Sequence, residues 1–140
     1  MILARLLEIL FYGKNKDIRF IYSIELADDI QLTPMDICTI LANQIDNAIE
    51  AAEKIEDPAL RYVQVDIAQK QRYTFFRVEN SIKEGSVSEQ EIFNTTKENK
   101  RDHGIGISNI ESVAERYGGT LQMEINPSKV ISIVIVQTEK

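Results

Sequence analysis

The fold is decided by residues 33–53, TPMDICTILANQIDNAIEAAE, because this stretch predicts one long helix. Thr33 is suited to cap the helix, Pro34 to open its first turn, and Asp36 follows the cap by three residues. With about 100° of rotation per residue, one side of the helix is apolar and should face a core. That side carries Ile37, Leu41, Ile45, Ala48 and Ala52, and the other side groups Asn43, Asp46, Asn47 and Glu50.

The polar side of this helix differs from an ordinary solvated face, which is the alternative interpretation. Residues 33–53 contain no Lys or Arg, although solvated faces usually carry both. Asn is a poor helix former, yet Asn43 and Asn47 stand one turn apart in mid-helix. Carboxamide and carboxylate oxygens are hard ligands suited to Mg²⁺. This side of the helix therefore predicts a site for Mg²⁺ and a phosphate ligand.

The rest of the chain predicts an α+β fold. An apolar stripe suggests a helix over Met1–Tyr12, and Gly104–Tyr117 suggests a glycine-rich turn that leads into another helix. Alternating or apolar runs predict five strands, namely Ile18–Leu26, Tyr62–Ala68, Tyr73–Glu79, Thr120–Asn126 and Val130–Thr138. The second and third strands, and the fourth and fifth, should form hairpins. We therefore expect two layers: a mixed, mostly antiparallel sheet of about five strands, with helices on one face.

The composition limits the range of functions. A chain of 140 residues predicts one domain, and its net charge of −6 argues against a nucleic-acid binder. A single cysteine, Cys38, excludes an intramolecular disulfide and favours a cytoplasmic setting. No apolar run is long enough to cross a bilayer, so we expect no membrane contact from this chain.

A second candidate feature lies between residues 81 and 107. The stretch Ser81–His103 is long and polar, as is typical of a mobile lid. It ends on the glycine-rich sequence His103–Ile107, which precedes a helix whose free N–H groups could bind phosphate. Lys97, Lys100 and Arg101 form a basic patch just before it. A plain helix-entry turn and a solvated charge run are the alternatives, but together these features favour a lid that closes on phosphates.

These motifs resemble the GHKL ATPase superfamily over nearly the whole chain. Residues 41–52 look like its N box, Thr95–Lys97 and His103–Ile107 like its ATP lid and second glycine box, and Tyr117–Leu121 like its stop after the lid helix. The resemblance implies a Bergerat-type two-layer sandwich that binds ATP and Mg²⁺. Within the superfamily, the chain is most similar to the peptide-pheromone receptor histidine kinases of Gram-positive quorum sensing.

The resemblance also implies roles for individual residues. Asn47 would coordinate the Mg²⁺ that bridges the phosphates, and Asn43 would hydrogen-bond nearby. Asn80 stands where relatives have the aspartate that accepts a hydrogen bond from adenine, although their Asp-x-Gly-x-Gly pattern is missing here. The full set of nucleotide-binding residues that it implies is Asn43, Asn47, Asn80, Thr96, Lys97, His103, Gly104, Gly106 and Ile107.

One position indicates the type of reaction. ATP-hydrolysing relatives carry a Glu where Asn43 stands, and an amide cannot take a proton from water at neutral pH. The resemblance therefore implies transfer of the γ-phosphoryl group to a histidine on another domain, since His103 lies in the lid motif and is not assigned as acceptor. We interpret residues 1–14 as the end of an upstream dimerisation and phosphoacceptor region, and residues 15–140 as the catalytic ATP-binding domain.

These inferences predict a fragment of a longer, membrane-bound sensor kinase. Its partners would be its own upstream phosphoacceptor domain and, indirectly, a response regulator. Two alternatives remain: an anti-sigma-type protein serine kinase, and a degenerate, nucleotide-free interaction module suggested by the altered first glycine box.

Overall fold

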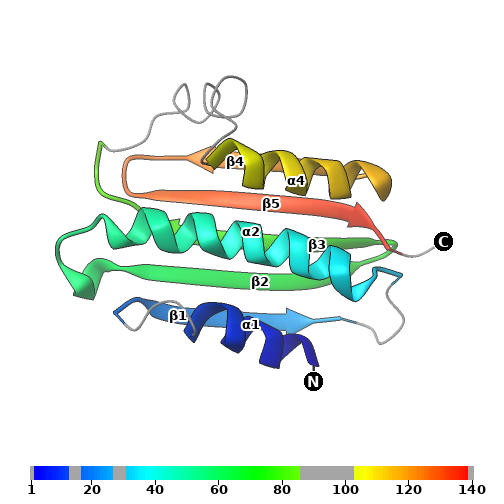
Figure 1. Ribbon diagram of the computed structural model, residues 1–140, viewed down its shortest axis with the longest axis horizontal. Coiled ribbons are helices and arrows are strands. Elements are labelled where there is room, and N and C mark those ends of the chain that lie inside the picture. Colours follow the sequence, from blue (N-terminus) through cyan, green and yellow to red (C-terminus); the bar gives the residue numbers. More distant parts are fainter. Residues whose placement is uncertain (1, 13–16, 27–30, 86–102, 139–140) are drawn as a thin grey trace.

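The computed structural model describes residues 2–12, 17–26, 31–85 and 103–138, which form one five-stranded sheet with its α-helices on one face (Figure 1). The order of strands across the sheet is β1-β2-β3-β5-β4. Along the chain the elements are α1 (Ile2–Tyr12), β1 (Arg19–Glu25), α2 (Pro34–Glu53), the short 3₁₀ helix η1 (Pro58–Leu60), β2 (Tyr62–Lys70), β3 (Tyr73–Ser81), α4 (His103–Arg116), β4 (Thr120–Ile125) and β5 (Lys129–Gln137). None of the helices in these ranges is long and apolar enough to cross a membrane.

The pairing of the strands confirms the predicted α+β class. β1 and β2 are parallel, so α2 forms the crossover between them. β2 with β3, β3 with β5, and β4 with β5 are antiparallel. The first hairpin turns at Gln71, whose φ of 57° lies in the left-handed region. The sheet is therefore mixed and mostly antiparallel, as the two predicted hairpins required.

The core lies between this sheet and the helices. In Figure 1, α1 lies over β1, α2 over the centre of the sheet, and α4 over β4 and β5. Side chains from all these elements form one buried cluster. Leu7 and Phe11 of α1 are completely buried in it, and the ring of Phe11 stacks on Phe20 with centroids 4.2 Å apart. Helix α1 thus shares the core of the domain, while the assignment of residues 1–14 to an upstream region stays a prediction.

Helix α2 begins as predicted but buries more of its surface. The hydroxyl of Thr33 accepts a hydrogen bond from the Asp36 amide at 3.1 Å, which is the expected N-cap. Four of the five predicted core residues are buried, and Ile37 is half-buried. Ile40, Gln44 and Ile49 are buried as well, because α2 lies between α1 and α4 on top of the sheet.

Helix α4 begins earlier than predicted. Its first residue is His103, so Gly104 and Gly106 lie in the first helical turn and not in a separate turn before it. Its inward face consists of Ile107, Ile110, Val113 and Ala114, which are buried. The helix ends at Arg116, where the Tyr117–Leu121 motif predicts a stop. Gly118 has a φ of 67°, and a Cβ atom on Gly119 would lie 1.7 Å from the backbone oxygen of Ile135.

A buried carboxylate joins α2 to the residues that end α4. Asp36 accepts a hydrogen bond from the hydroxyl of Tyr117 and another from Arg116 Nη2 at 2.8 Å. The Tyr117 hydrogen bond is the largest influence on this group; together with Thr33 and Arg116 it outweighs burial and holds the pKa of Asp36 below its ordinary value of 3.8. Asp36 is therefore charged at neutral pH and ties the N-terminus of α2 to the end of α4.

We predict unequal roles for the two partners of Asp36. Tyr117→Phe should lower the free energy of unfolding by about 1.5–3 kcal/mol, because it removes a hydrogen bond to a charged group that stays buried. Arg116→Ala should cost under about 1 kcal/mol, because 63% of the Arg116 side chain is exposed and solvent screens its charge. Urea denaturation of both variants measures the difference. Equal losses would show that the tyrosine hydroxyl is not the main partner.

Candidate functional site

The described elements that carry predicted site residues approach one another toward one end of the sheet. Three elements meet there: the C-terminal half of α2, the C-terminal end of β3 and the first turn of α4 (Figure 1). Helices α2 and α4 run side by side in opposite directions above the sheet. Loop-lined ends of this kind, where several elements converge, are typical places for ligands.

Asn43 lies directly against α4. Its Nδ2 atom donates a hydrogen bond to the backbone oxygen of Thr39, one turn earlier, at 2.7 Å. This contact fixes the amide so that Oδ1 points the other way. A Cβ atom on Gly106 would lie 3.2 Å from Asn43 Oδ1, so the absence of a side chain at Gly106 is what allows the close approach. The structure therefore brings two predicted site residues together across the two helices.

Asn47 lies one helical turn beyond Asn43. This turn is a step of about 5.4 Å along α2. Because α2 and α4 are antiparallel, Asn47 lies closer to the start of α4 than Asn43, which faces Gly106. The backbone N–H groups of that first turn have no acceptor within the helix. Asn43, Asp46 and Asn47 are all half-buried and only Glu50 is exposed, so most of the polar side of α2 is not a freely solvated face.

Asn80 lies near the end of β3, on the side of the sheet that the helices cover. Like Phe76 and Val78 before it, it is buried. Its Nδ2 atom donates to the backbone oxygen of Ser81 at 3.0 Å, which leaves Oδ1 as an oriented acceptor. Asn80 therefore faces the same interlayer region as α2, as its expected role requires.

The remaining predicted residues are placed only in part. The side chain of Ile107 is buried in the core, so any contact that this residue makes with a ligand must come from its backbone. Gly104 and His103 belong to the first turn of α4, and the described structure does not include the His103 side chain. Thr96, Lys97 and the basic patch at Lys100 and Arg101 lie outside the described residues, as does most of the predicted lid.

Sequence reasoning missed one polar residue next to the site. Gln44 is only 2% exposed, and its Nε2 atom donates to the backbone oxygen of Phe76 at 3.1 Å and to Ser132 Oγ at 3.0 Å. The signal was present, because the helical wheel places Gln44 at the edge of the apolar arc, next to Ile37. A polar residue in that arc predicts a buried hydrogen-bonding group.

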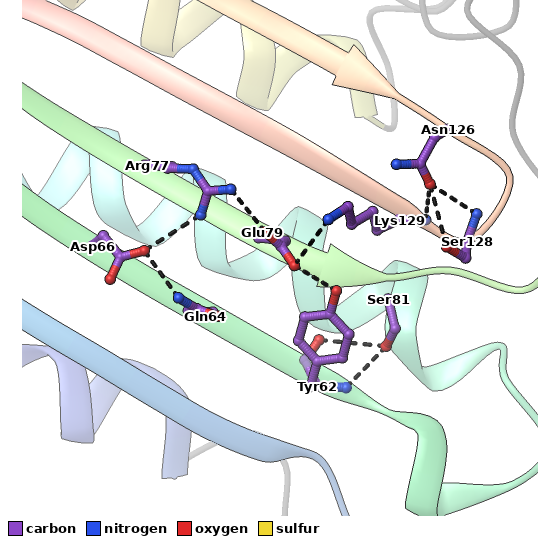
Figure 2. Close-up of polar contacts among 9 residues, drawn as sticks. All are labelled: Tyr62, Gln64, Asp66, Arg77, Glu79, Ser81, Asn126, Ser128 and Lys129. Carbon is purple, nitrogen blue, oxygen red and sulfur yellow. Dashed lines mark hydrogen bonds and ion pairs between the residues drawn. The ribbon is translucent and has the colours of Figure 1, made fainter.

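The opposite face of the sheet carries a separate network of charged side chains (Figure 2). Glu79 accepts hydrogen bonds from Tyr62 at 2.6 Å and from Arg77 at 2.8 Å, and Lys129 lies 3.8 Å away. Arg77 also reaches Asp66 at 3.3 Å. Since successive residues of a strand point to opposite faces, this network is separated from Asn80 by the sheet.

The network determines two pKa values. Burial would raise the pKa of Glu79, but the hydrogen bonds from Tyr62 and Arg77 and the charges of Lys129 and Arg77 together keep it below its ordinary value of 4.5. Burial and the bond to Glu79 raise the pKa of Tyr62 to about 12. Glu79 is therefore a charged, fully engaged group that stabilises the sheet.

Comparisons with known proteins identify what this arrangement is similar to. A family model described as the GHKL domain matches residues 32–137, about three quarters of the chain. No sequence among curated proteins is significantly similar to the chain.

Solved structures share the fold. The catalytic domain of histidine kinase ThkA is 20% identical with a TM-score of 0.77, over 98% of this chain and 92% of that one. The Acinetobacter baumannii histidine kinase AdeS is 16% identical with a TM-score of 0.71, over 99% and 64% of the two chains. The histidine kinase domain of a blue-light activated kinase from Erythrobacter litoralis is 14% identical with a TM-score of 0.71, over 97% and 59%. At these identities the likeness shows the fold alone.

We predict that Glu79 stabilises the fold only above acid pH. A carboxyl group with a lowered folded-state pKa contributes fully above its unfolded value near 4.5, and the contribution is lost as the pH falls through the folded value. Glu79→Gln should cost about 1–2 kcal/mol at pH 7, and this difference from wild type should shrink below about pH 4.5. Denaturation series at several pH values measure it, with the exposed Glu124→Gln as the matched control. A pH-independent cost would contradict the prediction.

Proposed function

The chain belongs to the GHKL domain family, and we propose that it is the ATP-binding catalytic domain of a two-component sensor histidine kinase. The likeness of its fold to histidine kinase catalytic domains supports this choice within the family. The observation that carries the proposal is the contact between Asn43 and Gly106. It aligns the polar side of α2 with the first turn of α4, as a phosphate site between them requires.

The charges on α2 support a site that needs a cation. Asp46 and Glu50 share the polar side of the helix with the two asparagines, and they would repel a triphosphate. Bound Mg²⁺ would neutralise this repulsion and draw charge from the phosphate oxygens. Mg²⁺ takes few protein ligands beside phosphates and waters, so the carboxamide oxygen of Asn47 suffices as a direct ligand.

The remaining contacts follow from the same arrangement. The backbone at Gly104, Gly106 and Ile107 would cradle the phosphate oxygens. Because α4 begins at His103, the N–H groups without an acceptor in the helix lie at residues 103–105, and Gly104 would donate one of them. Asn80, buried at the end of β3 with its amide held by Ser81, would accept a hydrogen bond from the amino group of adenine. Thr96, Lys97 and His103 keep their proposed roles as lid contacts with the nucleotide.

The chemistry of Asn43 favours transfer over hydrolysis. Its amide donates to Thr39 and cannot accept a proton from water at neutral pH. The domain would therefore hold and orient the γ-phosphoryl group, and the nucleophile would come from a histidine of an upstream dimerisation and phosphoacceptor domain. A response regulator would receive the phosphoryl group afterwards, in the cytoplasm beneath a membrane-bound sensor.

A finer assignment within the kinases rests on motif likeness. The run Asp46–Ala51 and the sequence His103–Ile107 resemble those of peptide-pheromone receptor kinases. We propose a quorum-sensing parent protein on this basis. Sequencing of the parent gene tests it, since membrane spans and a histidine-bearing helix upstream are expected.

Binding of Mg-ATP tests the proposal. Calorimetry should detect binding at millimolar nucleotide or below, and EDTA should weaken it. Asn47→Ala should reduce the affinity at least tenfold, about 1.4 kcal/mol, because it removes the metal ligand. Gln122→Ala, an exposed change on the other face of the sheet, is the matched control and should bind as wild type does. The absence of any binding would reject the proposal.

A gain of hydrolysis tests the role of Asn43. Asn43→Glu introduces a carboxylate that can take a proton from an attacking water, so phosphate release from Mg-ATP should rise above the wild-type rate. Asn43→Gln is matched to it in size but remains an amide, and it should show no increase. Equal rates for the two variants would contradict the assignment of position 43.

A further inference from the structure

The buried side chain of Gln44 has one atom without a partner. Its Nε2 atom has two hydrogens, and the backbone oxygen of Phe76 and Ser132 Oγ accept them. Its Oε1 atom is buried and accepts no hydrogen bond from any described residue. Buried acceptors are rarely left unpaired, since each one costs stability. This oxygen therefore calls for a functional explanation.

The orientation of the Gln44 amide is fixed by its neighbours. If the amide were rotated by half a turn, Oε1 would face the backbone oxygen of Phe76, and two acceptors would oppose each other. Nε2 must therefore point to Phe76 and Ser132, and Oε1 must remain the acceptor. Gln44 presents one oriented oxygen in the layer between α2 and the sheet.

One residue beside Gln44 is partly exposed. On the helix-facing side of β5, Val130, Val134 and Val136 are buried, but Ser132, which binds the Gln44 amide, is only half-buried. Ser132 pairs with Val78, two residues before Asn80 on the same side of β3. Asn80 and Ser132 are therefore diagonal neighbours, with Cα atoms roughly 7–8 Å apart. Gln44 and Asn80 therefore both lie next to Ser132, the partly exposed residue on this side of β5.

We propose that Gln44 helps to select the nucleobase, and that its Oε1 atom accepts a hydrogen bond from the exocyclic amino group of bound adenine. This inference rests on the proposed function. The amino group has two hydrogens, so Asn80 Oδ1 and Gln44 Oε1 can each accept one. Guanine carries a carbonyl oxygen at the same position, which would face Oε1 as acceptor against acceptor. The pair thus distinguishes adenine from guanine, although the Asp-x-Gly-x-Gly pattern is absent.

Calorimetry with three nucleotides tests the inference. The probes are Mg-ATP, Mg-GTP and purine riboside triphosphate, whose base carries hydrogen in place of the amino group. Wild type should bind ATP at least tenfold more tightly than either of the others. Gln44→Leu, which replaces the amide by an apolar side chain of similar size, should bind ATP more weakly but leave the affinity for purine riboside triphosphate unchanged within about twofold. A purely structural role would change both affinities by the same factor.

Controls separate the possible failures. Thermal unfolding shows whether Gln44→Leu is folded; if it is not, Gln44→Met and Ser132→Ala, which removes a hydroxyl that holds Nε2, take its place. Each should reduce the ratio of the two affinities. Failure of wild type to bind any nucleotide would reject the proposed function itself. Binding of ATP by wild type with an unchanged ratio in the folded variants, or with no preference over purine riboside triphosphate, would overturn the role of Gln44 alone.

Discussion

The packing of α2 against α4 is the constraint on which the rest of the structure depends. At one end, the buried carboxylate of Asp36 binds Tyr117 and Arg116 and holds the start of α2 to the end of α4. At the other end, the absence of a side chain at Gly106 lets the first turn of α4 approach Asn43. Because the helices are antiparallel, these two contacts determine which residues of α2 face the free N–H groups of α4. Residues far from the site thus position it.

Successive side chains of each strand point to opposite faces of the sheet, so the two faces can have different roles. Asn80 points toward the helices, while its neighbour Glu79 points to the other face and joins Tyr62, Arg77 and Lys129 (Figure 2). A slip of β3 by one residue would exchange the two side chains and place a carboxylate where the adenine contact is proposed. The ion network on the outer face, together with the buried Val78 on the inner one, favours the observed register.

The helix ends and the strands could be predicted because neighbouring residues in the sequence determine them. Thr33 and Pro34 marked the start of α2, Gly118 and Gly119 marked the end of α4, and alternation marked the strands. The start of α4 was predicted wrongly, and the burial of Gln44 was not predicted. Gly104 and Gly106 lie inside α4 because that helix packs on α2 from its first turn. Gln44 is buried against strands β3 and β5, and neither predicted side of α2 included it. The positions of Asn43, Asn47 and Asn80 followed from motif likeness, and their roles stay predictions.

We propose that a nucleotide binds where α2, the end of β3 and the start of α4 meet. Amide resonances of the ¹⁵N-labelled chain, recorded during titration with Mg-ATP, test this location. The largest shift changes are expected in residues 43–50, 80–82 and 103–107, while amides at the opposite end of the sheet, such as Gln71 in the turn between β2 and β3, should stay unchanged. Absence of shift changes at saturating nucleotide, or changes centred on that opposite end, would rule out this location.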